Sequence, residues 1–256
     1  MATFESIARK YGAIDVHDFK QVQFLKSVTG EAHPQGKCFA FVLAYFTCLR
    51  TGLAGKYLLD NLERAVRDND RAVIREILGD PAQVSSNPNW VGQDLFNLQS
   101  LENVLAEYYA AIGLTREKSR RFDDRFFRNR AVGRYISDSV PLYSIIKSRV
   151  HIMAAVSHPY SERDEYTFFD PNFGEAIFHG GEDLTSFVAA FFSRKVINKG
   201  YRPKIADLDN VPLMGDEEKQ MVRQEARSLI LTVEGFRESV AVPPPRRDKH
   251  GQIIAN

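Results

Sequence analysis

The sequence is poor in cysteine and nearly balanced in charge. Its 34 basic and 33 acidic residues give a formal net charge of +1, so the whole molecule has no field that would attract nucleic acid or an acidic lipid surface. We therefore expect no nucleic-acid partner, and any membrane contact must be local. Cys38 and Cys48 are the only cysteines, which argues against a disulfide framework and predicts free thiols in a reducing compartment.

Long apolar runs and a leader-like start are also lacking. The longest apolar runs, Cys38 to Leu49 and Ser186 to Phe192, fall short of the roughly 20 residues that cross a bilayer. Residues 1–5 have neither the basic stretch and apolar block of a secretory signal peptide nor the glycine at position 2 that N-myristoylation requires. The 44% of hydrophobic and 26% of charged residues are typical of a globular domain.

Helical patterns dominate the first half of the chain and strand patterns follow them. Apolar spacing predicts helices at Cys38–Leu49, Tyr57–Val66, Arg71–Leu78, Leu95–Ile112, Leu184–Ile197 and Glu217–Phe236. Short β-branched or aromatic runs predict strands at Val150–Ser157, Tyr166–Asp170 and Glu175–His179. This order indicates an α+β fold in which a helical half packs against a mainly antiparallel sheet, with the site in a cleft between them.

Three segments are expected along the chain. Residues 1–30 read as an N-terminal lead-in of helix and loop, and residues 31–236 as the main folded domain. Residues 237–256 include three consecutive prolines followed by charged residues, which predicts an exposed, flexible tail.

One stretch is strongly basic. Arg116 to Arg130 contains seven basic and three acidic residues, with Phe122 and Phe126 spaced to share one face of a helix. An amphipathic helix with a solvated basic side is the simpler interpretation. The functional alternative is a patch for an acidic partner or for peripheral contact with a membrane surface.

Cys38 stands where a nucleophile could be mounted. A loop containing Pro34 and Gly36 delivers it into the first turn of a predicted buried helix. A thiol reacts as the thiolate, and the partly positive N-terminus of a helix stabilises that charge. Taken alone, however, a cysteine beside an apolar run is more often a small core residue, and this is how Cys48 reads.

His151 and Asp170 are the candidates for the base and for the group that orients it. His151 begins one predicted strand and Asp170 ends the next, so antiparallel pairing would place them side by side. A cysteine nucleophile needs an imidazole within hydrogen-bond reach and a third group that holds the ring. Taken singly, His151 reads equally as a structural histidine and Asp170 as a turn-capping residue before Pro171.

The segments around these two residues carry a family resemblance. His151 to Val156 (HIMAAV), Phe168 to Glu175 (FFDPNFGE) and Ile177-Phe178, together with Gly36-Lys37-Cys38, resemble the YopT/AvrPphB family of papain-like cysteine proteases. The family consists of effectors that bacteria inject into host cells. The resemblance implies that residues 31–236 form a papain-like cysteine protease domain that hydrolyses peptide bonds. In it, Cys38 would form the acyl-enzyme, His151 would move the proton and Asp170 would fix the imidazole, with no metal or organic cofactor.

The resemblance has further implications for location and partners. It implies secretion without a cleavable signal peptide and action in the host cytoplasm on a host protein, either a small GTPase or a kinase. The oligomeric state stays open. One alternative is a different thiol acyl chemistry on the same triad (transglutaminase, deamidase or acyltransferase), since all three enzymes pass through a thioester. A second alternative is a catalytically weak binding module with the same fold.

The oxyanion hole departs from the family pattern. Papain-like enzymes usually have Gln or Asn five or six residues before the nucleophile, whereas this chain has His33 and Ala32 there. Gln35 is the nearest amide, and we rank it first as the oxyanion donor, ahead of His33 and of backbone amides alone. Losing one such donor typically costs about 100-fold to 1,000-fold in rate.

Overall fold

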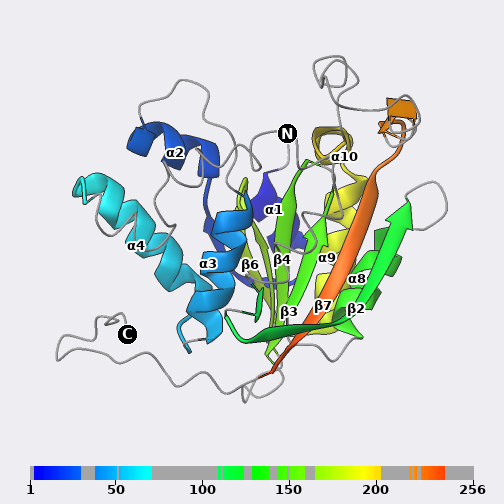
Figure 1. The fold of residues 1–256 in the computed structure, drawn as a ribbon, viewed down its shortest axis with the longest axis horizontal. Helices are drawn as coiled ribbons and strands as arrows, with labels where there is room; N and C mark the ends of the chain where they lie inside the picture. Colours follow the sequence, from blue (N-terminus) through cyan, green and yellow to red (C-terminus); the bar gives the residue numbers. More distant parts are fainter. Residues whose placement is uncertain are drawn as a thin grey trace.

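The computed structural model of the chain is an α+β structure in which helices cover both faces of one sheet (Figure 1). It describes residues 3–29, 38–50, 52–70, 109–110, 112–123, 129–138, 143–148, 150–158, 165–202, 219–220, 222–223 and 226–239. The predicted helix 71–78, most of 95–112 and the tail from residue 240 lie outside these ranges. Within them, no helix is both long and apolar enough to cross a bilayer.

The sheet has seven strands in the order β1-β6-β5-β4-β3-β7-β2, and every neighbouring pair is antiparallel. The strands are β1 (Ala13–Asp18), β2 (Leu114–Asp123), β3 (Tyr143–Lys147), β4 (Ile152–His158), β5 (Glu165–Asp170), β6 (Gly174–Phe178) and β7 (Ile230–Glu238). The α+β class and the mainly antiparallel sheet are therefore confirmed.

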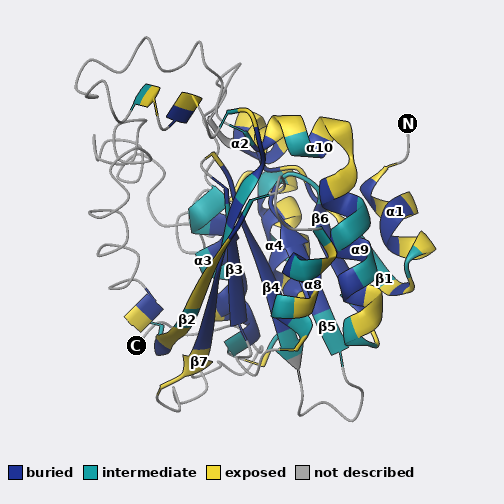
Figure 2. Cartoon of the chain, turned by 90° about the vertical axis from the view of Figure 1, so that its right-hand side faces the viewer, coloured by how far each residue is buried: buried dark blue, intermediate teal, exposed yellow. Residues whose placement is uncertain are grey.

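Two helical layers enclose the sheet. The helices are α1 (Phe4–Lys10), α2 (Gln21–Thr29), α3 (Cys38–Arg50), α4 (Gly55–Arg67), α8 (Asn129–Ser137), α9 (Gly181–Ser193) and α10 (Lys195–Gly200). Strand residues alternate between two cores: Ala154 and Phe169 pack with α3 and α4, whereas Met153 and Phe168 pack with α1, α8 and α9. The central strands are consequently buried on both faces (Figure 2). Their sequences therefore do not alternate between apolar and polar residues.

Most of the predicted elements occur where expected. The helices α3, α4 and α9 match the periodic segments, and β4, β5 and β6 match the three short β-branched or aromatic runs. Cys48 lies on α3 and is buried in the core, as predicted.

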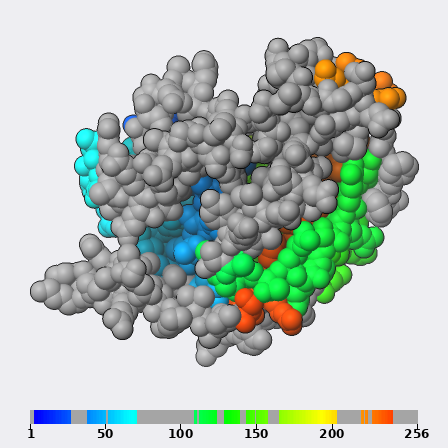
Figure 3. Space-filling model, viewed as in Figure 1, coloured from blue at the N-terminus to red at the C-terminus, as the bar shows by residue number. Residues whose placement is uncertain are grey.

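The predicted helix Arg116–Arg130 is wrong in its first half, because residues 114–123 form the edge strand β2. The register pairs Phe122 with Leu231 of β7, and both side chains are buried. Cross-strand burial thus overrides the local helical spacing. Much of the strand is exposed and lies on the surface in Figure 3 (green), so apolar alternation was too sparse to reveal it. Contact of this basic stretch with a membrane stays a prediction.

The predicted helix Glu217–Phe236 is also wrong at its C-terminal end. Residues 230–238 form β7, which lies between β3 and β2. Leu231 and Val233 face one core while Phe236 faces the other, so the strand is buried on both sides and has no clear period of two. The segment was long enough to read as a helix.

The N-terminal residues contain a strand that the apolar pattern did not reveal. Residues 13–18 form β1, which pairs with β6 at one edge of the sheet. Phe19 and Gln21 follow it and donate backbone hydrogen bonds to the carbonyls of Phe173 and Pro171 at 3.2 and 2.8 Å. The N-terminal segment therefore contacts the turn that follows Asp170.

Candidate active site

Cys38 is the first residue of α3 and is half-buried. The helix behind it is anchored by buried side chains on its core face, including Phe41, Val42 and Tyr45. Unpaired backbone amides and the positive end of the helix dipole occur at such a first turn. The position suits a thiolate.

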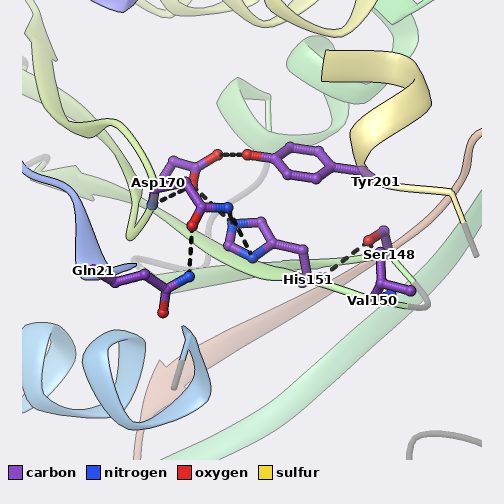
Figure 4. A network of polar contacts seen from close by, with 7 residues as sticks. Gln21, Ser148, Val150, His151, Asp170 and Tyr201 are labelled. Atoms are coloured by element: carbon purple, nitrogen blue, oxygen red, sulfur yellow. Dashed lines mark hydrogen bonds and ion pairs between the residues drawn. The ribbon is translucent and has the colours of Figure 1, made fainter. Parts of the chain in front are cut away.

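His151 and Asp170 form a buried pair. The register that pairs Ala154 with Phe169 places the start of β4 beside the end of β5. His151 Nε2 lies 2.7 Å from Asp170 Oδ1, and the two side chains are 4% and 0% exposed. Sequence reasoning placed these two residues side by side through the strand pairing, and the structure brings them together (Figure 4).

The backbone of His151 is held by a tight turn from β3. The amide of Ser148 donates to the His151 carbonyl at 2.8 Å, and the Ser148 hydroxyl donates to the same oxygen at 3.3 Å. Val150 N in turn donates to Ser148 Oγ at 3.3 Å. These bonds fix the backbone of His151 just before β4 begins.

Tyr201, at the end of α10, contacts both members of the pair. Its hydroxyl donates to Asp170 Oδ2, and its ring stacks on the His151 ring with centroids 4.5 Å apart and planes 20° from parallel (Figure 4). Burial, together with the charge of Asp170, raises the pKa of Tyr201 well above its usual value. Tyr201 therefore remains a hydrogen-bond donor that fixes the carboxylate.

Asn172 completes the environment of the pair. Its backbone amide donates to Asp170 Oδ1 at 2.8 Å, and its Nδ2 lies 3.5 and 3.4 Å from His151 Nδ1 and Nε2. An atom so nearly equidistant from both nitrogens would collide with Cε1 if it lay in the ring plane. The Asn172 amide consequently lies against the face of the imidazole.

The surroundings favour a charged imidazole. Burial alone would lower the pKa of His151, but the charge and hydrogen bond of Asp170, with a smaller contribution from a hydrogen bond to the Cys38 side chain, raise it to about 10. Because Nε2 faces Asp170, Nδ1 is the nitrogen left for the thiol. A thiolate–imidazolium pair held by a carboxylate is the arrangement that thiol acyl chemistry needs.

The remaining predicted site residues are placed as follows. Gln35 and His33 lie outside the described residues, so their part in an oxyanion hole stays a prediction. Among the described residues, no cluster of three His, Cys, Asp or Glu side chains has the geometry to hold a metal ion.

The sequence did not predict that Tyr201, Gln21 and Asn172 lie at or near the His151–Asp170 pair. Tyr201 lies 31 residues after Asp170 along the chain, and no periodic or motif signal relates the two. Asn172 lies in the turn from Asp170 to Gly174. Asparagine is common in turns for conformational reasons, so its presence there did not indicate a contact with His151.

Comparison with known proteins agrees with the family resemblance. Residues 140–208 match the model of a peptidase family described as Yersinia/Haemophilus virulence surface antigen. This segment contains His151, Asp170 and Tyr201, whereas Cys38 precedes it. Over this segment the chain is similar to a peptidase family of bacterial virulence proteins, and its predicted resemblance to the YopT/AvrPphB type is confirmed there.

Two solved structures resemble the fold more distantly. The avirulence protein AvrPphB of Pseudomonas has a TM-score of 0.44 and 11% identity, and the match covers 90% of this chain and 98% of that one. PatoxP, the cysteine protease-like domain of the Photorhabdus asymbiotica toxin PaTox, has a TM-score of 0.36 and 17% identity, covering 74% of this chain and 51% of that one. The search of curated proteins found no match.

A buried polar contact joins the helix of Cys38 to the hairpin of Asp170. Tyr45 of α3 stacks on Phe169 with ring centroids 4.4 Å apart, and its hydroxyl donates to Glu175 of β6. A Cβ on Gly55 would come within 2.2 Å of both the Glu175 carboxylate and the Tyr45 ring. Glycine at this position lets α4 close over the contact, and Tyr45 fixes the spacing between α3 and the β5–β6 hairpin.

Glu175→Gln is expected to change the pH dependence of stability. Burial raises the pKa of Glu175 to about 7, although the Tyr45 hydroxyl acts in the opposite direction. The folded state therefore holds a proton that the unfolded state has lost, so wild-type stability falls as pH rises from about 4.5 to about 7. The variant is expected to gain about 2–3 kcal/mol relative to wild type between pH 5 and pH 8, as measured by urea unfolding.

Glu63→Gln is the matched control, since Glu63 is exposed on α4. It should leave the pH dependence of unfolding unchanged. A Glu175→Gln variant that follows the wild-type curve at every pH would contradict the assignment of a buried, titrating carboxyl group.

Proposed function

We propose that the protein is a cysteine endopeptidase in which Cys38 is the nucleophile, His151 the general base and acid, and Asp170 the residue that orients the imidazole. The observation that carries the proposal is the buried His151–Asp170 ion pair, with Cys38 at the start of α3 as the candidate nucleophile. The family of residues 140–208 supports the reaction class.

The mechanism follows from the two ring nitrogens. In the resting pair His151 Nδ1 holds the proton of the Cys38 thiol, and the thiolate sulfur attacks the carbonyl carbon of the peptide bond to form a tetrahedral intermediate. His151 then protonates the leaving amine, and a thioester remains on Cys38. Water attacks the thioester after giving its proton to His151, the carboxylic acid is released, and the thiolate–imidazolium pair is restored. Throughout, Asp170 stabilises the imidazolium.

Further parts of the proposal concern the surroundings of the reaction. Gln35, with His33 as the alternative, would supply the side-chain donor for the oxyanion. The substrate would be a host protein, a small GTPase or a kinase, reached in the host cytoplasm after secretion without a cleavable signal peptide. Membership of residues 140–208 in a virulence family supports this setting.

The test is a comparison of wild type with Cys38→Ala in host-cell lysate. Mass spectrometry of newly formed N-termini should find one or a few cleavage sites that require Cys38, and Cys48→Ala should produce the same sites as wild type. Ammonia release or a mass gain on an acceptor, without any new N-terminus, would replace hydrolysis by deamidation or acyl transfer. Identical N-termini from wild type and Cys38→Ala would overturn the proposal.

A further inference from the structure

The N-terminal segment contacts the turn that follows Asp170 with side chains as well as with backbone. Gln21, the first residue of α2, is only 3% exposed. Its Nε2 donates to Asn172 Oδ1 at 2.6 Å while its backbone amide donates to the Pro171 carbonyl at 2.8 Å. Figure 4 shows Gln21 approaching from the side opposite Ser148 and Val150.

Asn172 relays this contact to the reacting groups. Its backbone amide bonds the same Asp170 oxygen, Oδ1, that bonds His151 Nε2, and its side-chain nitrogen lies against the imidazole face. An asparagine amide has one oxygen and one nitrogen end. With its oxygen held by Gln21, the nitrogen end is turned toward the imidazole, which fixes the rotamer.

The backbone makes the clamp two-sided. Phe19 N donates to the Phe173 carbonyl at 3.2 Å, so the turn is bonded by the residues on either side of Lys20. Gly174 ends the turn with φ +112°, and a Cβ there would lie 2.0 Å from the His17 carbonyl oxygen. The turn that carries Asp170 is therefore shaped by residues 17–21.

We propose that Gln21 is a positioning residue of the active site, which holds the Asp170–His151 pair in its reactive alignment through the side chain of Asn172. The inference rests on the proposed function, because alignment of the pair matters only if His151 serves Cys38. It makes residues 17–21 part of the catalytic unit, although the sequence indicated only a lead-in there.

The experiment compares Gln21→Met, Gln21→Ala and Asn172→Ala with wild type by two measurements. Methionine keeps the volume and removes the donor. The first measurement is alkylation of Cys38 by iodoacetamide at pH 7, which should slow by about 10-fold to 100-fold in each variant, because small misalignments of reacting groups have effects of this size. Cys38 in the double variant Gln21→Ala/Asn172→Ala should be alkylated no more slowly than in the slower of the two single variants, since both substitutions remove the same contact.

The second measurement is NMR of the His151 imidazole, assigned with His151→Ala. Its pKa should fall toward the ordinary histidine value in the Gln21 variants, because a looser Asp170 contact weakens the interactions that raise it. The exchange of the Asn172 amide hydrogen should quicken in parallel. Gln23→Ala, at an exposed position on the same helix, should change neither quantity.

The outcomes separate the two proposals. If Cys38 is alkylated no faster in wild type than in His151→Ala, the proposed function fails. The imidazole titration then still tests whether Gln21 and Asn172 hold the Asp170–His151 pair. If Gln21→Met and Gln21→Ala leave the His151 pKa and Cys38 alkylation as in wild type, the positioning role is overturned. A lower melting temperature with an unchanged imidazole titration would likewise overturn it, leaving a structural role only.

Discussion

Replacing His151 by alanine is expected to lower the rate at which an epoxide such as E-64, or another substrate-like electrophile, labels Cys38 by about 100-fold or more at neutral pH. In the proposed mechanism this substitution removes the imidazolium partner of Cys38 and the proton carrier of the acyl transfer. Peptide hydrolysis should fall further, by about 10,000-fold, because both half-reactions need the same ring.

Cys48 provides the internal reference for this experiment. Its thiol is buried, and burial raises its pKa to about 12, so it should stay unlabelled in the folded protein whether His151 is present or not. Peptide mapping of the labelled protein measures both cysteines at once. Equal labelling of Cys38 and Cys48, insensitive to His151→Ala, would remove the basis of the catalytic assignment.

The parts of the fold that were predictable from sequence are those whose signal is local. Helix α4 has an amphipathic stripe, and the turn with Pro171 and Gly174 separates β5 from β6. Each of these elements can therefore be predicted from about a dozen consecutive residues. Strands β2 and β7 cannot. The side chains of β2 are mostly exposed at a sheet edge, and those of β7 are buried on both faces. Neither shows the alternation that marks a half-buried strand. Their conformation is explained by pairing in the sheet, β7 with β3 and β2, and β2 with β7.

The site divides in the same way. Asp170 and His151 were accessible to reasoning because antiparallel pairing of β4 and β5 relates their positions by register. Tyr201 contacts Asp170 from the end of α10, and Gln21 contacts Asn172 from the N-terminal segment, through hydrogen bonds that span 31 and 151 residues of sequence. A buried tyrosine or glutamine has no distinctive spacing, and its partner is defined only by the tertiary structure.

Gly174→Ala is expected to have the largest effect on stability. The residue has φ +112°, which side chains rarely tolerate, and its Cβ would lie 2.0 Å from His17 O and 2.7 Å from Phe19 N. These are backbone atoms, so no rotamer change relieves the overlap, and β1 must separate from β6. Backbone strain of this kind costs about 1–3 kcal/mol by itself. With the overlap added we expect a loss of at least about 4 kcal/mol, or about 10 °C in Tm.

Gly52→Ala distinguishes strain from overlap. Gly52 also has a positive φ, +74°, but a Cβ there meets nothing within 4 Å. Its substitution should therefore cost only the conformational strain, roughly 1 kcal/mol. If thermal unfolding showed Gly174→Ala to be no worse than Gly52→Ala, the close approach of residues 17–19 to the Asp170 turn would be refuted. If instead Gly174→Ala is the more damaging and also slows Cys38 labelling, the same backbone contact supports both the sheet edge and the alignment of the acid with its histidine.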